Sequence, residues 1–527
     1  MKPKLKQKRG IPFPTHIVFS AVSLIVQVVF FAVMIMGLSE TYFFMNTLCT
    51  ILSVIMVLYI TNSSGKSSYK ILWIIFILAV PIFGVMAYMF FGGGRVLPHV
   101  KRKMQKCEEK YINQLPRNNE IHETLRYSDG LHSRQADYLK RESAYPLYKN
   151  SSAEFLAPGE AFLPPFLEEH EKAERYIFIE FFIIAEGKMW SSVCNILERK
   201  AREGVEVKIL FDDFGSIKRQ HKNFVTRLRR KGIEVAVFNK IRPSMDIFMN
   251  NRNHRKIVVI DGKIGYIGGM NIAERYLKGV HNGDWRDTHL RITGTACQDL
   301  QQVFLDDWRK LSSATDIDLP TLYLGKADTT SATPTQPTEG AQPAQSAVQI
   351  IASDPQDSIP PILQAMIQMA DSAKQYLYIQ SPYFLPPKPL QEALCEAAKR
   401  RVDVRLMIPK RGDRSIFISY ASRSYLKPLL AAGVKIYFHT FGFIHAKAWV
   451  ADDKIATVGS SNIDFRSFMQ SSEVNAFVYD TIFAQRMRQI FEQDMWHCDM
   501  IPQDWWQQRS IQERLLQVFV KPFAYFM

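Results

Sequence analysis

The apolar residues of this chain follow two different patterns, and the change comes near residue 100. Before that point they form three runs without a charged residue, at 17–38, 42–60 and 71–91. Each run is about as long as the ~20 helical residues that cross the hydrocarbon core of a bilayer. Three such runs would need a very large core to bury them, so the pattern predicts a membrane region over residues 1–92 with two or three transmembrane helices.

The charges around these runs bear on their orientation. Cations cluster before the first run, within residues 2–9, and again after the third, within residues 95–106. Cations beside a span favour the cytoplasmic side, and three full crossings would place the two clusters on opposite sides. Pro81 and Gly84 interrupt the third run, so we expect that run to be re-entrant or interfacial and the rest of the chain to face the cytoplasm.

From about residue 108 onward, short runs rich in β-branched and aromatic residues alternate with charged stretches of helical length. This alternation predicts an α/β fold in which helices cover a β-sheet. The runs recur in the same order in two parts of the chain, which predicts two tandem α/β domains at 108–324 and 347–527, related by a pseudo-two-fold axis. The matching segments are YIFIEFF (176–182) and YLYIQSP (376–382), VEVKILFDD (205–213) and VDVRLMIPK (402–410), GIEVAVF (232–238) and GVKIYFH (433–439), and FLDDW (304–308) and FEQDMW (491–496).

Between the two halves, residues 325–346 read GKADTTSATPTQPTEGAQPAQS. This stretch contains almost no large apolar side chain, so it cannot bury enough surface to offset the entropy lost on ordering. We therefore predict a flexible linker.

A longer motif also occurs once in each half. NHRKIVVIDGKIGYIGGMN at 253–271 matches IHAKAWVADDKIATVGSSN at 444–462 in an identical register of His, Lys, Asp, a pair of small residues and Asn. The residues after each histidine are apolar and partly β-branched, which predicts a buried strand. Because side chains alternate along a strand, each histidine and the lysine two positions later are expected to point the same way.

The doubled set of residues predicts a site for a phosphate oxyanion. One histidine on a strand is most often a structural residue, but a lysine on an apolar strand is costly to bury without an anion. If the halves pack symmetrically, both sets face one cleft, where the two lysines neutralise the phosphoryl oxygens. One histidine then attacks phosphorus and the other serves as acid and base, and their pKa values should split accordingly.

No cofactor is expected, and no metal site either. The lysine pair supplies the positive charge that a divalent cation brings to other phosphoryl-transfer sites. The six cysteines stand singly, without the spacing of a zinc site or a disulfide framework. The residues alone do not say which histidine is the nucleophile.

These motifs resemble a known family. The doubled His-x-Lys-x4-Asp motif is the signature of the phospholipase D superfamily, and FIEFFIIAEG, ILFDDFGS, WRDTHLRITG and VGSSNIDFRSF are similar to segments of bacterial cardiolipin synthases. The resemblance implies two tandem phospholipase D-like domains in a multi-pass enzyme of the bacterial cell membrane. It also implies that a phosphatidyl group passes from one phosphatidylglycerol to another through a phosphohistidine, giving cardiolipin and glycerol.

The resemblance further implies roles for individual residues. His254 would be the nucleophile and His445 the acid and base, with Lys256 and Lys447 on the phosphate. Ser471 and Ser472 depart from the family pattern, which has an asparagine and an aromatic residue there. The other expected site residues are Asp261 and Asp452, which either take part in catalysis or only organise a turn; Asn271 and Asn462, which would bind substrate; and Asp287 and Glu473, which would orient a histidine ring.

The same chemistry leaves other acceptors open. With water as acceptor the protein would be a phosphodiesterase, either a lipid hydrolase or a nuclease, and a different donor and acceptor would make it a phosphatidylserine synthase. The formal net charge of +15 would suit nucleic acid. The apolar front end does not suit a nuclease, so phosphatidylglycerol and membrane lipid are the expected partners and nucleic acid is not.

Overall fold

A computed structural model describes residues 39–63, 67–89, 130–240, 251–277, 285–311, 346–357, 359–412 and 416–526, together with Ile25 and Val29. The chain divides into two compact units. One consists of Met1–Arg95 and Lys240–Asn250, and the other of Val96–Asn239 and Asn251–Met527. The linker expected at 325–346 lies outside the described residues except for Ser346.

The amino-terminal unit contains α2 (Ser39–Asn62), α3 (Ser67–Ala79) and α4 (Pro81–Ala87). These helices contact one another, and Ile60 of α2 packs with Trp73 and Ile77 of α3. Lys70 donates from Nζ to the carbonyl of Thr61 at 2.8 Å, which ties the start of α3 to the end of α2.

The predicted transmembrane helices are not supported by this unit. Within the described ranges, no helix combines the length and the apolarity that crossing a membrane requires. The run at 71–91 is divided between α3 and α4, because Pro81 has no N–H with which to continue α3. The run at 17–38 lies outside the described residues apart from Ile25 and Val29.

The larger unit holds the two repeated halves and every strand among the described residues. Those of the first half are β1 (Leu147–Leu156), β2 (Tyr176–Phe181), β3 (Glu206–Asp212), β4 (Glu234–Phe238), β6 (Lys256–Ile260), β7 (Ile264–Gly268) and β9 (His289–Gly294). Those of the second half are β10 (Ser346–Ser353), β11 (Tyr376–Gln380), β12 (Asp403–Pro409), β13 (Lys435–His439), β15 (Ala448–Ala451), β16 (Ile455–Gly459), β17 (Ser471–Tyr479) and β18 (Cys498–Met500).

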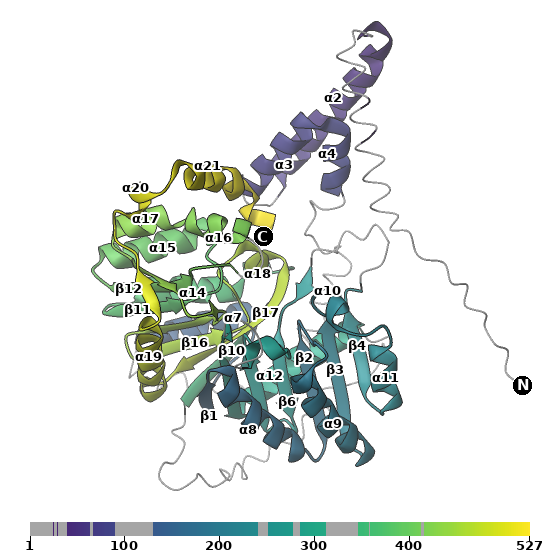
Figure 1. Cartoon of the computed structure of the whole chain (residues 1–527), viewed down its shortest axis with the longest axis vertical. Helices are drawn as coiled ribbons and strands as arrows, with labels where there is room; N and C mark the ends of the chain where they lie inside the picture. Colours follow the sequence, from purple (N-terminus) through teal and green to yellow (C-terminus); the bar gives the residue numbers. More distant parts are fainter. Residues whose placement is uncertain are drawn as a thin grey trace, which may run out of the picture. The chain divides into compact units, whose positions relative to one another are not determined.

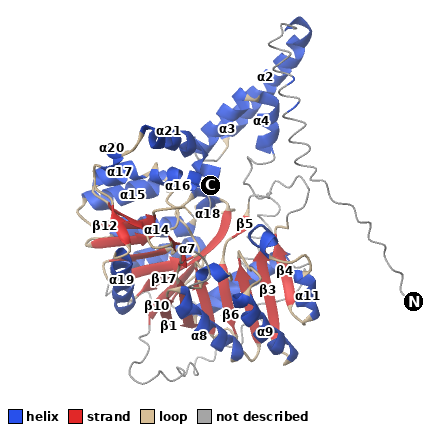
Figure 2. Cartoon of the chain, in the orientation of Figure 1, coloured by secondary structure: helices blue, strands red, loops and turns tan. Residues whose placement is uncertain are grey.

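These strands form one continuous sheet rather than one sheet per half (Figures 1 and 2). The first half follows the order β1-β9-β7-β6-β2-β3-β4, and the second the matching order β10-β17-β16-β15-β11-β12-β13, with β18 added at the edge. β1 and β10 pair antiparallel in the middle, so each covers the edge that the other half would expose. The predicted duplicated α/β fold is confirmed, and the two halves share their sheet.

Helices cover both faces of this sheet (Figure 2). On one face α12 (Ala296–Leu311) and α19 (Thr481–Met495) lie over a core to which both halves contribute. On the other face there are two separate cores. One is built by the first half, with helices α8 (Gly159–Glu171), α9 (Lys188–Arg202) and α11 (Phe224–Arg230). The other is built mainly by the second half, with α14 (Pro361–Ser372), α15 (Lys388–Lys399) and α17 (Leu426–Ala432), and it also takes in α7 (Gly130–Ser143), which precedes β1 in the chain.

Several shorter elements complete the larger unit. They are α10 (Asp213–Ser216), α16 (Ile416–Arg423), α18 (Phe465–Met469), α20 (Trp505–Gln508) and α21 (Ile511–Val520), the 3-10 turns η2 (Ile217–Arg219), η3 (Glu274–Tyr276) and η4 (Lys521–Phe526), and the two-residue strands β5 (Arg252–Asn253), β8 (Trp285–Arg286) and β14 (Phe443–Ile444).

Candidate active site

Each histidine of the repeated motif lies in a turn between a two-residue strand and a longer buried strand. His254 follows β5 and precedes β6, and His445 follows β14 shortly before β15. The apolar residues after each histidine therefore form the buried strands that the sequence predicts. Each histidine lies just before its strand. Lys256 is the first residue of β6, and Lys447 directly precedes β15.

Both short strands pair with the opposite half of the chain. β5 runs parallel to the start of β17, and β14 runs parallel to β8. The backbone N–H of His254 donates to the carbonyl of Ser472 at 2.9 Å, and that of His445 to the carbonyl of Arg286 at 2.7 Å. Each histidine is thus held at the boundary between the halves by the half that does not contain it.

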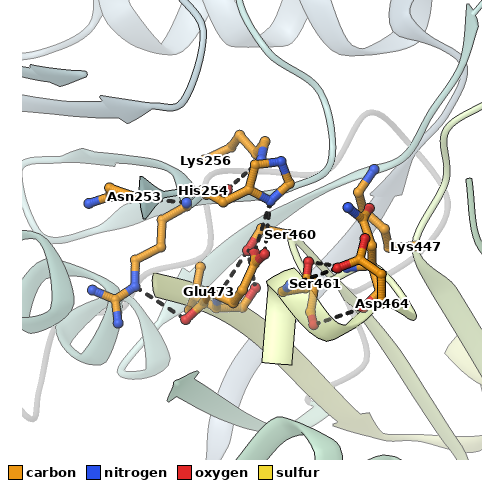
Figure 3. Close-up of polar contacts among 12 residues, drawn as sticks. Asn253, His254, Lys256, Lys447, Ser460, Ser461, Asp464 and Glu473 are labelled. Carbon is orange, nitrogen blue, oxygen red and sulfur yellow. Dashed lines mark hydrogen bonds and ion pairs between the residues drawn. The ribbon is translucent and has the colours of Figure 1, made fainter. Parts of the chain in front are cut away.

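The first histidine is oriented by a carboxylate from the second half. Nδ1 of His254 lies 2.9 Å from Oε1 of Glu473, and the other carboxylate oxygen accepts a hydrogen bond from the hydroxyl of Ser460 (Figure 3). A carboxylate can only accept, so Nδ1 carries the proton and Nε2 keeps its lone pair. The ring of Phe182 packs edge-on against the imidazole, with ring centroids 5.0 Å apart.

The second histidine is oriented in the same way by the first half. Nδ1 of His445 lies 2.5 Å from Oδ2 of Asp287, whose Oδ1 accepts from the N–H of Thr288 at 2.7 Å. Trp285 and Phe443 pack against the imidazole with centroid distances of 5.0 and 6.0 Å. Asp287 and Glu473, named from the sequence as orienting residues, therefore each contact one histidine.

The two motif lysines lie in the same site as the histidines. Lys256 donates from Nζ to the carbonyl of His254, and Lys447 to the carbonyl of His445. Nζ of Lys447 also lies 2.8 Å from Nδ1 of His445 and 4.0 Å from Oδ2 of Asp287. Since that Nδ1 already gives its proton to Asp287, the ammonium lies against the ring without accepting or donating there.

The two sets also influence each other electrostatically. Burial, with a smaller contribution from the charge of Lys447, lowers the pKa of Lys256 to about 7, and burial lowers that of Lys447 to about 8. Lys447 also acts on the pKa of His254, and Lys256 on that of His445. Charges act strongly only over short distances in a protein, and this mutual influence agrees with the short-strand pairings that hold both histidines at the boundary between the halves.

The expected split of the two histidine pKa values is not seen. Burial lowers the pKa of His254 to about 4, and it lowers that of His445 to about 3, so both imidazoles are neutral at pH 7. Each ring is removed from water and has its own neighbouring lysine, which favours the neutral form in both cases. The partner carboxylates act in the opposite direction without overcoming burial.

The two motif aspartates lie at the far ends of the motif strands. Asp261 accepts hydrogen bonds from the backbone N–H groups of residues 174, 175 and 176, each at 2.8 Å. Asp452 does the same for residues 374, 375 and 376, at 2.7 to 2.9 Å. Asp261 follows Lys256 by five strand residues, about 16 Å along the chain. These contacts match the turn-organising role that the sequence left open, and the structure does not bring either aspartate to the histidines.

The motif asparagines have other contacts. Asn271 accepts from the N–H of Ile183 and donates to the hydroxyl of Tyr276, both at 2.9 Å, so its amide joins the loops around the first set. Asn462 makes a side-chain hydrogen bond to Asp464. Its Oδ1 is buried and receives no hydrogen bond from the described residues. The Asn462 oxygen therefore keeps its full capacity to accept hydrogen bonds among the described residues, whereas that of Asn271 already accepts one.

A buried arginine behind the first set was not identified from the sequence. Arg255 is only 1% exposed, forms an ion pair with Asp307 of α12, and lies 3.0 Å from Asp354. Its Nε donates to the carbonyl of Glu473 at 3.2 Å. The guanidinium therefore holds the backbone that carries the first orienting carboxylate.

The second set has an arginine in the equivalent role. Arg286 pairs with Asp494 of α19 at 2.8 Å and donates from Nη1 to the carbonyl of Asp287, also at 2.8 Å. Asp307 and Asp494 occupy matching places in the repeated FLDDW and FEQDMW segments. This recurrence is the sequence feature that could have pointed to the two arginines, because an aspartate repeated on a core-facing helix needs a buried cation as its partner.

The part of the chain that the structure describes contains no group of three or more His, Cys, Asp or Glu side chains placed to hold a metal ion.

Family models and known proteins match most of the length of this chain. The model for the phospholipase D-like domain of cardiolipin synthase matches residues 166–308 and 366–496, and the phospholipase D-nuclease N-terminal model matches residues 50–93. A cardiolipin synthase of Geobacillus kaustophilus is 35% identical over 472 residues, 89% of this chain and 90% of that protein. One from Oceanobacillus iheyensis is 32% identical over 484 residues, 90% of this chain and 97% of that protein.

A solved structure supports the fold. The phosphatidylserine synthase of Haemophilus influenzae aligns with a TM-score of 0.55 at 15% identity, covering 75% of this chain and 97% of that one. At this identity the likeness bears on architecture alone. The family assignment rests on the two matched domains and on the relatives at 32–35% identity. The chain belongs to the family of cardiolipin synthases with phospholipase D-like domains.

Proposed function

We infer that this protein is a cardiolipin synthase, a phosphatidyltransferase that uses two molecules of phosphatidylglycerol to make cardiolipin and glycerol. The observation that carries this function is the similarity to cardiolipin synthases along about nine-tenths of the chain. The site supports the same reading, because two neutral imidazoles and two buried lysines suit a phosphodiester.

In the first step we propose that the donor phosphate lies between Lys256 and Lys447. Nε2 of His254 forms a bond to phosphorus while the bond from phosphorus to the glycerol oxygen breaks. The leaving oxygen takes the proton of His445 Nε2, and Asp287 stabilises the imidazolium that supplies it. Because burial lowers the pKa of His445 to about 3, that proton has to arrive with the anionic substrate, whose charge raises this pKa.

In the second step the roles reverse. A hydroxyl of the second phosphatidylglycerol gives its proton to Nε2 of His445, and its oxygen bonds to phosphorus as the bond to His254 breaks. The lysines stay on the phosphoryl oxygens throughout, where negative charge is greatest in both transition states. Cardiolipin leaves, and both imidazoles return to the state in which they began.

We also propose that the enzyme works at the bacterial cell membrane, with the larger unit on its cytoplasmic face. The expected substrates are lipids, and α2 and α3 expose large apolar side chains, among them Ile55, Leu58 and Ile75. Cations flank this part of the chain in the sequence. Protease digestion of sealed vesicles of known orientation tests the sidedness: cleavage of the larger unit only when the cytoplasmic face is accessible supports it.

The decisive experiment is conversion of labelled phosphatidylglycerol by the purified full chain. Cardiolipin and free glycerol in equal amounts are the expected products, with EDTA present. Phosphatidic acid as the main product would instead identify a hydrolase. Complete loss of activity in EDTA would contradict a mechanism in which lysines, and no divalent cation, neutralise the phosphate.

A further inference from the structure

The helix α21 exposes four of its large apolar side chains to solvent. Ile511, Leu515, Val518 and Phe519 are 74%, 66%, 73% and 65% exposed. Their spacing of i, i+4, i+7 and i+8 places them on one face of the helix. A surface helix of a globular domain normally buries such a stripe, so this arrangement is the reverse of the usual one.

The opposite face of α21 is packed on the larger unit. Gln517 and Val520 are buried, and Val520 and Ala524 form a small core with Phe465 of α18. Ser510 caps the amino-terminal end of the helix by accepting a hydrogen bond from the N–H of Glu513. Because the helix is capped and anchored, its exposed stripe is a property of the fold.

Positive charge lies beside the stripe. Arg514 and Lys521 are seven residues apart, so they follow one edge of the apolar face. Over residues 509–523 there are three cations and one acid, Glu513, which already lies 3.5 Å from Arg423. An apolar helix face edged by cations fits the boundary between the headgroups and acyl chains of an anionic bilayer.

The stripe is close to the active site. Phe465, on which α21 is anchored, directly follows Asp464, whose charge acts on Lys447. Figure 3 shows the Asp464 carboxylate beside Lys447. The small core under α21 therefore includes the first residue of α18, which follows directly on this loop.

We infer that the face formed by Ile511, Leu515, Val518, Phe519 and Phe523 docks on an anionic bilayer and sets the active site at the depth of the lipid headgroups. This inference rests on the proposed function, since a lipid substrate has to reach the site from a membrane. A second copy fits the face less well, because a symmetric pairing would bring the like charges along its edges together.

Lipid contact can be measured directly on the full chain. An environment-sensitive fluorophore is attached at Val518→Cys in a background without other reactive thiols, and the protein is reconstituted in equimolar phosphatidylglycerol and phosphatidylcholine. Spin-labelled lipid should quench this probe several-fold more than a probe at Gln485→Cys on α19, an exposed position on the opposite face of the sheet. Equal quenching at both positions overturns the inference. Burial of α21 against a second copy or against the amino-terminal unit would produce that result. Equal quenching in pure phosphatidylcholine overturns the preference for anionic lipid.

A kinetic test separates docking from chemistry. Val518→Ser combined with Phe519→Ser should raise the KM for phosphatidylglycerol in vesicles by about tenfold or more, because two large apolar side chains lose a lipid contact. Activity on monomeric short-chain phosphatidylglycerol should stay within about twofold. An unchanged KM in vesicles contradicts docking. A wild-type protein that makes no cardiolipin from either substrate contradicts the proposed function, and the quenching result still stands by itself.

Discussion

The two histidine sets have the same backbone arrangement, a short strand followed by a longer one, but their surroundings differ. The His254 side chain is 15% exposed and the His445 side chain 8%. His254 is supported by the longer Glu473, which Ser460 also contacts, whereas the shorter Asp287 reaches His445 past Gly269. The more open ring suits a nucleophile that must carry a phosphatidyl group, and the more enclosed ring suits a proton carrier.

The small residue next to each carboxylate, Gly269 in the first half and Ser460 in the second, explains part of this difference. A Cβ on Gly269 would lie 2.2 Å from Oδ1 of Asp287, so only glycine allows that carboxylate to approach. At the matching position of the second half, Ser460 fits because Glu473 stands further back along its longer side chain and accepts the hydroxyl. The extra methylene of Glu473 and the hydroxyl of Ser460 thus occur together in the second half, and the first half has neither.

The largest expected effect is that of removing either histidine. His254→Ala and His445→Ala should each lower kcat by about 10⁴-fold or more, because one loses the nucleophile and the other the proton carrier. Labelled phosphatidylglycerol should leave acid-labile label on the wild type and on His445→Ala, and none on His254→Ala. Label on His254→Ala would exchange the two roles.

Neutralising the orienting carboxylates should be the next most severe change. Glu473→Gln and Asp287→Asn keep the shape, but an amide can donate to Nδ1 and so favour the wrong tautomer, for an expected loss of about 10²–10⁴-fold in kcat. The loss should be greater for Asp287→Asn, because His445 has to become positively charged. Thermal unfolding of both variants provides the control, and wild-type kcat in either one contradicts the orienting role.

Exchanging the small residue beside each carboxylate tests the comparison directly. Gly269→Ser should reduce kcat by about 10²-fold or more, because its Cβ displaces Asp287. Ser460→Gly, which makes the second set resemble the first, should cost only about three- to tenfold, the loss of one hydrogen bond to Glu473. Equal effects of the two substitutions would refute the asymmetry.

The pH dependence should come from the lysines. Burial lowers their pKa values to about 7 and about 8, so protonated lysine is lost as pH rises through this range rather than near 10. We expect kcat/KM to fall by up to about tenfold per pH unit above pH 8. Lys256→Arg is the matched control: a guanidinium stays protonated, so a variant that remains active should lose the part of the decline that Lys256 causes. A flat profile to pH 9.5 in the wild type would contradict the assignment.

The smallest effect on catalysis is expected at the motif aspartates. Asp261→Asn and Asp452→Asn should change kcat by less than about threefold, because both carboxylates bind backbone N–H groups at the far ends of their strands. Each should lower the free energy of unfolding by about 1–3 kcal/mol. A hundredfold fall in kcat with an unchanged free energy of unfolding in denaturant would show that these aspartates take part in catalysis.

Much of the protein follows from its sequence. The alternation of apolar runs and charged stretches is local, and it determined the strands and helices of both halves. Repetition determined the duplication, and the histidine–lysine spacing identified the residues that meet in the site. Asp287 and Glu473 could also be named from the sequence, because a histidine that takes part in catalysis commonly needs a carboxylate to orient its imidazole.

Only the tertiary structure decided which half supports which histidine. His254 and Glu473 are 219 residues apart, and His445 and Asp287 are 158 apart, so no local pattern records their pairing. The shared sheet depends on β1 meeting β10, which is again a long-range choice between edges. Burial, which lowers all four histidine and lysine pKa values, and the outward face of α21 likewise depend on what packs on each element rather than on the element itself.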